Sequence, residues 1–94
     1  MTIQQFRDDD RGYLSWTAAH SGGFVLNIER SFNISDARLH HAYCHTINGV
    51  PARGRTWTGP YIKVCSLLLT DLRDWARANL RGAVPACGVC QPPW

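Results

Sequence analysis

The chain has 94 residues, which allows one domain with a small hydrophobic core. Its 45% hydrophobic and 11% aromatic content argue against a disordered segment. The start MTIQQFRDDDRGY has no signal-peptide core, and no run approaches the roughly 20 apolar residues that span a membrane. We therefore expect one cytoplasmic domain over residues 1–94, with no membrane partner.

The net charge of +3 is distributed unevenly along the chain. Residues 1–37 hold three arginines against five acidic residues, whereas residues 38–94 hold six arginines and Lys63 against Asp71 and Asp74. Nine of the ten basic residues are arginine, whose planar guanidinium suits bidentate contact with phosphate or carboxylate. This pattern favours an acidic partner, either nucleic acid or an acidic protein surface.

The first predicted element is a helix that begins at Asp10 and ends near His20. Asp10 is a suitable N-cap, and the two aspartates before it complement the helix dipole. Tyr13 and Trp16 belong to an apolar stripe with helical spacing, which predicts that they lie in the core. We expect Phe6 to pack back on the first turn of this helix.

The middle of the chain predicts strands separated by turns. Residues 23–29 alternate apolar and polar side chains as a strand does, and a second strand is expected near residues 37–43, paired with the first as a hairpin. Glycine and proline are dense in residues 48–60, which predicts a long exposed loop. A third strand follows at residues 61–65.

The last predicted element is a helix over residues 67–81, followed by Gly82 as the residue just past its end. Its apolar face is formed by Leu69, Leu72, Ala76 and Leu80. Arginines spaced four residues apart line another face. The fold class predicted from these elements is α+β, with about three antiparallel strands, two helices and a C-terminal zinc knuckle.

Two pairs of metal-ligating residues support that knuckle. His40 and Cys44 form one pair, and Cys87 and Cys90 form the other, with Gly88 allowing a tight turn between the cysteines. Zinc takes four such donors at the corners of a tetrahedron, and one turn can supply two of them. Because cytosolic thiols are kept reduced, metal ligation is favoured over the alternative of a secreted protein with disulfides. The predicted cofactor is Zn²⁺.

The identity of the histidine ligand is less constrained than that of the cysteines. In a strand, His40 lies on the same side as Cys44, whereas His41 points away, so His40 is favoured. His41 remains an alternative ligand, as does Cys65 in a four-cysteine site. A buried free thiol is the favoured interpretation of Cys65.

The order of these motifs resembles the Ada-type metal-binding module over roughly residues 37–93. The resemblance rests on LHHAYC, the strand YIKVC, the helix LTDLRDWARANL and the terminal VPACGVCQP. It implies a zinc ion bound through His40, Cys44, Cys87 and Cys90. It also implies an association with DNA metabolism.

A four-ligand site leaves no open position for water, so we expect a structural zinc and no catalytic residue. The predicted function is recognition of nucleic acid, with DNA favoured, because arginines beside aromatic rings can contact phosphates and stack on bases. The predicted contact residues are Arg53, Arg55, Trp57, Tyr61, Lys63, Arg73 and Arg77.

Two other functions fit the same composition. Trp, Tyr and Arg are also the usual hot spots of protein interfaces, so a protein-interaction or regulatory module is the main alternative. A small basic nuclease or toxin is the enzymatic alternative. In that enzyme, His41 or His45 would act as the base and Arg53 or Arg55 would stabilise the phosphate.

Overall fold

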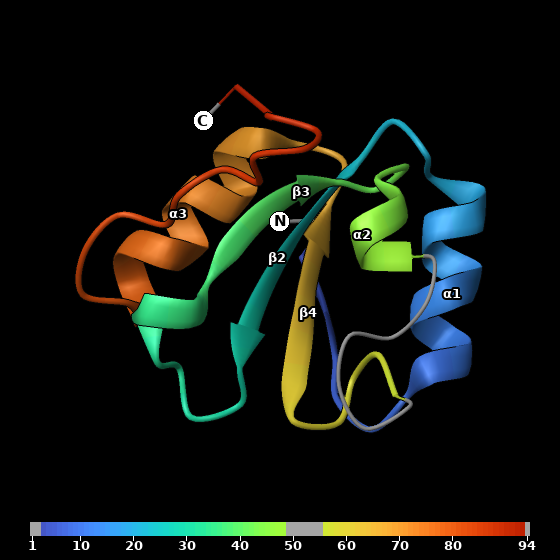
Figure 1. Ribbon diagram of the computed structural model, residues 1–94, viewed down its shortest axis with the longest axis horizontal. Helices are drawn as coiled ribbons and strands as arrows, with labels where there is room; N and C mark the ends of the chain where they lie inside the picture. The colour runs from blue at the N-terminus through green and yellow to red at the C-terminus, as the bar shows by residue number, and fades with distance from the viewer. Residues whose placement is uncertain (1–2, 49–55, 94) are drawn as a thin grey trace.

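The computed structural model describes residues 3–48 and 56–93 and shows a four-stranded antiparallel sheet between helices (Figure 1). In chain order the elements are β1 (Gln4–Phe6), α1 (Asp10–Ala19), β2 (Phe24–Glu29), a 3-10 turn (Ile34–Asp36), β3 (Arg38–His41), α2 (His45–Asn48), β4 (Tyr61–Ser66) and α3 (Leu69–Asn79). The strand order is β1-β4-β2-β3, and all neighbours are antiparallel. The predicted α+β class and the hairpin of β2 and β3 are confirmed.

The sheet has four strands rather than the predicted three, because β1 was not expected. This strand has only three residues, two of which are exposed glutamines, so its sequence carries almost no alternation. Its pairing with β4, which places Phe6 opposite Lys63, makes it a strand. The short helix α2 is a second addition, since its four residues precede and enter the predicted loop.

Helix α1 begins at Asp10, as predicted, but its N-cap is Asp9. The Asp9 carboxylate accepts a hydrogen bond from the Gly12 amide at 2.9 Å, which satisfies one of the free N–H groups of the first turn. The rings of Phe6 and Tyr13 meet edge to face at 6.0 Å between centroids. Phe6 therefore packs on the start of the helix as predicted.

One face of the sheet is covered by α3. The buried core on this side joins alternate strand residues with the apolar face of the helix, and consists of Leu26, Ile28, Ala37, Leu39, Ile62, Val64, Leu72, Ala76, Leu80 and Val84. The helix ends at Asn79, two residues before the predicted end. Gly82 still turns the chain, with φ +119°, a conformation that only glycine adopts without strain. The turn brings Val84 back onto this core.

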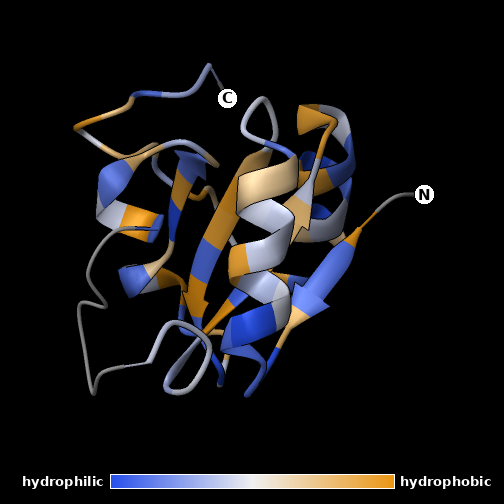
Figure 2. Cartoon of the chain, turned by 90° about the vertical axis from the view of Figure 1, so that its right-hand side faces the viewer, coloured by the Kyte–Doolittle hydropathy of each residue, from blue (hydrophilic) through white to orange (hydrophobic). Residues whose placement is uncertain are grey.

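The other face of the sheet is covered by α1 and α2, and Cys87 of the C-terminal segment joins the core on this side. In Figure 2, where α1 faces the viewer, hydrophobic and hydrophilic residues alternate along the strands behind it. The second core includes Tyr13, Trp16 and Val25 together with Cys44 and Cys87. The candidate metal ligands thus continue a hydrophobic core. Among residues 3–48 and 56–93, none of the helices has the length and the apolar sequence that a membrane span requires.

Candidate metal centre

Four side chains meet at the C-terminal end of β3. The ligand atoms of His40, Cys44, Cys87 and Cys90 all lie within 4.8 Å of one another. Cys90 is partly exposed and the other three are buried. All four cysteines of the chain are free thiols. The two predicted pairs therefore form one group that can hold a metal ion.

Strand β3 and the turn after it position the first pair. His40 is paired with Val25 and lies on the sheet face that α1 covers. His41 points the other way, where its ring is held between Phe24 and Tyr43 at centroid distances of 5.3 and 4.7 Å. The Cys44 amide donates to the His41 carbonyl at 3.0 Å, which turns the chain back toward His40. This arrangement agrees with the alternation argument that favoured His40.

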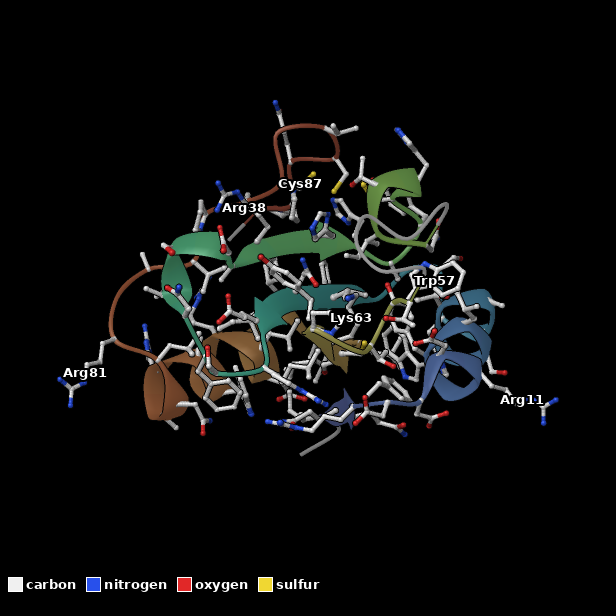
Figure 3. All side chains as sticks on the ribbon, turned by 60° about the horizontal axis from the view of Figure 1, so that its bottom comes forward. Arg11, Arg38, Trp57, Lys63, Arg81 and Cys87 are labelled. Carbon is white, nitrogen blue, oxygen red and sulfur yellow. The ribbon has the colours of Figure 1, made fainter. Side chains whose placement is uncertain are left out.

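The second pair reaches the site because the C-terminal segment runs beside β3. The Leu39 amide donates to the Pro85 carbonyl at 3.0 Å, and the Cys87 amide donates to the Leu39 carbonyl at 2.8 Å. These bonds form a parallel bridge between Leu39 and Ala86. Figure 3 shows Cys87 above the end of β3 and next to α2. The C-terminus is thus pinned to the second predicted strand, as expected.

Backbone amides point at the sulfurs of the second pair. The Val89 amide donates to Cys87 Sγ at 3.4 Å, and the His41 amide donates to Cys90 Sγ at 3.3 Å. The turn is closed by the Gln91 amide, which donates to the Cys87 carbonyl at 2.9 Å. Such donors stabilise the thiolate form, which is the form that binds metal.

The protonation state of the ligands depends on burial and nearby charge. Burial, with smaller effects from Lys63 and Arg38, lowers the pKa of His40 to about 4, so its imidazole is neutral near pH 7. Burial raises the pKa of Cys90 to about 12. Burial also opposes ionisation of Cys87, but the backbone donors outweigh it, and its pKa is lowered. Neutral imidazole is the form that coordinates zinc.

Thr46, on the first turn of α2, was not predicted as part of the site. Its Oγ1 lies 2.9 Å from Cys44 Sγ, 3.4 Å from His40 Nδ1 and 3.7 Å from Cys87 Sγ. One hydroxyl therefore contacts three of the four candidate ligands. One feature of the sequence could have indicated that Thr46 belongs to the site: it lies only two residues after the candidate ligand Cys44.

The residues present fit a zinc ion. Three thiols and one imidazole form one of the donor sets typical of structural zinc. Around one tetrahedral ion these atoms would lie about 3.5–3.8 Å apart. Ligand atoms within 4.8 Å of one another need to close by at most about 1.3 Å to reach that geometry. Three thiolates and one imidazole in this arrangement could therefore hold a metal ion.

Cys65 lies in the sheet, away from this group. It is fully buried, and Val25 separates it from His40 across the strands. Burial raises the pKa of its thiol, which keeps it protonated. The interpretation of Cys65 as a free thiol is confirmed, although it is more deeply buried than expected.

The predicted nucleic-acid contacts are divided between two faces of the sheet. Trp57 and Tyr61 are half-buried on the face that α1 covers, and the Tyr61 hydroxyl donates to Asp36 at 3.0 Å. Arg53 and Arg55 lie outside the described residues. Lys63 is only 4% exposed, and its ammonium donates to the carbonyl oxygens of Trp57 and Tyr61. Lys63 is thus placed inside the molecule and not on its surface.

Arg73 and Arg77 lie on the opposite face of the sheet. With Ala76, Gly82, Ala83 and Val84 they line a cavity of about 350 Å³ between α3 and the turn after it. Its lining contains two guanidinium groups and no acidic residue.

Similarity to known proteins gives no family for this chain. No protein-family model, curated protein or solved structure matches it. The resemblance to the Ada-type module therefore stays a prediction. One part of it agrees with the structure, because the four ligands that the resemblance implies lie close together.

Proposed function

We propose that this protein is a binding module stabilised by a structural zinc ion, that it is not an enzyme, and that it recognises nucleic acid, with DNA favoured. The zinc part of the proposal is supported by the donor count. Four protein side chains are in place around one point, whereas a catalytic zinc keeps one position for water or substrate. Zinc bound there would join the end of β3 to the C-terminal segment.

The observation that supports nucleic acid is the distribution of guanidinium groups. Beyond residue 37 the chain has seven basic residues and only Asp71 and Asp74 as acids. Arg73 and Arg77 line a cavity that has no acidic residue in its wall. A phosphate group is the common biological anion that such a pair binds at two points. The Ada-type resemblance favours DNA over RNA.

The test is binding of a labelled DNA duplex and a labelled single strand, measured by fluorescence anisotropy at rising salt. Contacts to several phosphates should weaken steeply between about 50 and 200 mM salt. The variant Arg73→Gln/Arg77→Gln should bind more weakly and show a shallower salt dependence. Arg11→Gln is the matched control, since Arg11 extends from α1 far from this cavity (Figure 3). Absence of binding to DNA or RNA at low salt would refute the proposal.

A protein-interaction module is the second candidate, and a specific observation favours it. The exposed large hydrophobic side chains of the described residues are Tyr43, Leu67, Leu68 and Val89. They follow the ends of β3 and β4 or lie in the metal-binding turn, all toward one end of the sheet (Figure 1). A protein partner would cover this apolar surface, and its binding would change little with salt.

The nuclease alternative has weaker support from the geometry. His41 is packed between Phe24 and Tyr43 and lies next to the metal ligands, while His45 is exposed at the start of α2. The two histidines are not joined to a carboxylate by a hydrogen bond within the described residues. DNA cleavage that is lost in His45→Ala with zinc retained would support an enzyme over a binding module.

A further inference from the structure

The turn that carries Cys90 lies at the surface of the molecule, whereas the rest of the metal centre is buried. Val89 and Gln91, on either side of Cys90, are exposed, and Cys90 itself is partly exposed. By contrast, Cys44 and Cys87 are only 3% and 7% exposed. Figure 3 shows the turn after Cys87 projecting outward from the sheet. A small solute therefore reaches the Cys90 sulfur before it reaches the other thiols of the site.

Cys87 and Cys90 are placed to form a disulfide within one turn. The Gln91 amide donates to the Cys87 carbonyl at 2.9 Å, which closes the turn. In a tight turn, Cα atoms three residues apart lie less than about 7 Å from each other, and disulfides join Cα atoms about 4.4–6.8 Å apart. Apart from its own chain neighbours, no described atom lies within 4 Å of the position that a Cβ on Gly88 would take. Rotation of the two side chains can therefore bring their sulfurs together.

Cys44 is the competing partner for Cys90, but it belongs to a separate segment. Its sulfur contacts the Thr46 hydroxyl at 2.9 Å, and its carbonyl accepts a hydrogen bond from the Asn48 amide at 3.2 Å, which fixes it at the start of α2. A disulfide between Cys44 and Cys90 would have to draw the C-terminal segment and α2 together. Cys87 needs no such movement, so it is the favoured partner.

Cys65 provides a thiol of the same chemistry that a solute does not reach. It is fully buried in β4, where it is paired with Gln4 on one side and Val25 on the other. Accessibility, and not the mere presence of a thiol, should therefore decide which cysteine of this chain reacts. Cys65 is an internal reference for any reaction at Cys90.

We propose that Cys90 is a modification site for hydroperoxides, at which oxidation forms a Cys87–Cys90 disulfide and empties the metal centre. This inference rests on the zinc part of the proposed function and adds a means of regulation to it. A hydroperoxide is small and can reach a partly exposed sulfur. The thiolate, which is the form present in a metal-bound cysteine, is also the form that attacks a peroxide.

The reaction has two steps. In the first, the Cys90 thiolate attacks one peroxide oxygen, so that an S–O bond forms and the O–O bond breaks; the sulfur is oxidised to a sulfenic acid, and the other oxygen leaves as water after taking a proton. In the second, the Cys87 thiolate attacks the Cys90 sulfur, so that the S–S bond forms and the S–O bond breaks. Hydroxide leaves and takes a second proton. One peroxide is reduced for each disulfide formed.

The disulfide removes two of the four donors from the metal centre. His40 and Cys44 remain, whereas a structural zinc site uses four protein donors, so the ion should be released. The C-terminal segment keeps its hydrogen bonds to Leu39 but loses its metal link to β3. A reducing thiol reverses the change, because two such thiols form their own disulfide while Cys87 and Cys90 are reduced.

The experiment treats the zinc-loaded protein with hydrogen peroxide and follows zinc release with a chromophoric indicator. The treated protein is then unfolded, alkylated and cleaved with trypsin, which places Cys44 in the peptide 39–53, Cys65 in 64–73 and the Cys87/Cys90 pair in 82–94. Zinc release should match disulfide formation one to one. By mass spectrometry, the peptide 82–94 should be two hydrogen atoms lighter and unalkylated, and the other two peptides should carry one alkyl group each. Dithiothreitol and added zinc should restore the starting protein.

Two variants separate reaction at Cys90 from general oxidation. Cys90→His keeps a zinc donor that cannot form a disulfide, so it should retain zinc and release it at least about tenfold more slowly in peroxide. Cys65→Ala is the matched control, because it removes a buried thiol outside the site, and it should release zinc at the wild-type rate. If Cys90→His does not load zinc, the peptide masses of the wild-type protein decide by themselves.

Three results would overturn the inference and leave the zinc site standing. They are retention of zinc by the wild-type protein in millimolar peroxide, a disulfide that joins the peptides 39–53 and 82–94, and oxidation of Cys90 that dithiothreitol does not reverse. A reduced protein that cannot be loaded with zinc at all would instead refute the zinc part of the proposed function.

Discussion

Replacing Thr46 by valine should weaken zinc binding, because the Thr46 hydroxyl is the side-chain donor closest to a candidate ligand. Its Oγ1 lies 2.9 Å from Cys44 Sγ, and its contacts with His40 and Cys87 are longer, at 3.4 and 3.7 Å. With zinc bound, three thiolates and one divalent ion give the site a net charge of −1. A hydrogen bond to the Cys44 thiolate disperses that charge.

The expected size follows from the shortest contact. A hydrogen bond to a charged group contributes about 1.5–3 kcal/mol, which corresponds to roughly 10- to 150-fold in zinc affinity. Removing a hydrogen-bond partner of a metal ligand typically costs about 10- to 100-fold. The side chain is exposed on α2, so valine fits without overpacking the core. The loss should therefore appear in metal affinity more than in folding of the zinc-loaded protein.

The assay is competition for zinc with a chromophoric chelator, followed by the charge-transfer bands of the cobalt-substituted protein. Thr46→Ser keeps the hydroxyl and should retain near wild-type affinity, whereas Thr46→Val should not. Thr70→Val, on the exposed first turn of α3, is the control for a hydroxyl lost far from the site. Equal zinc affinity in Thr46→Val and wild type, or equal losses in the serine and valine variants, would refute this reasoning.

Three further predictions concern folding and pH. Cys87→Ser should lose its zinc and unfold at a lower temperature, as shown by metal analysis and circular dichroism; a variant that keeps one zinc per chain would contradict the assignment. Leu72→Ala should lower the free energy of unfolding by about 2–5 kcal/mol in urea, since Leu72 is fully buried between α3 and the sheet; a loss below about 1 kcal/mol would show a loosely packed core. Burial lowers the pKa of Lys63 to about 8. In the unfolded chain the pKa of a lysine is about 10.4, so between pH 8 and 10 the unfolded state holds more protons than the folded state. The free energy of unfolding of the zinc-loaded protein should therefore rise over this range, by at most about 3 kcal/mol. Lys63→Met should abolish the rise, and a rise of equal size in that variant would assign it to another group.

The sequence was sufficient to predict the parts of the fold that follow from local periodicity. Helices α1 and α3 and strands β2 and β4 each carry an apolar face that repeats with the period of the element. The same reasoning placed His40 on the side of Cys44 and away from His41, which depends only on the alternation of a strand. The two ligand pairs are visible because each is close in sequence.

Features that depend on distant contacts could not be predicted in this way. Strand β1 exists because β4 offers it an edge, and its own residues give no sign of a strand. The burial of Lys63 was missed because a lysine beside a loop is normally solvated, and here its ammonium is used to hold the Trp57 carbonyl. The contact of Thr46 with three ligands requires the pairs to be assembled first.

The C-terminal segment also has a consequence for the behaviour of the protein after zinc loss. Strand β3 is an outer strand of the sheet, and its Leu39 amide and carbonyl are satisfied by Pro85 and Cys87. The metal ligands and these two hydrogen bonds hold that segment against the strand, together with the burial of Val84 and the hydrogen bond from the His41 amide to Cys90 Sγ. Chelation should release it and leave an unprotected strand edge, which is a template for pairing with a second chain. A metal-depleted sample should therefore self-associate through β3 as it loses its fold, so the zinc ion would protect the solubility of the protein as well as its stability.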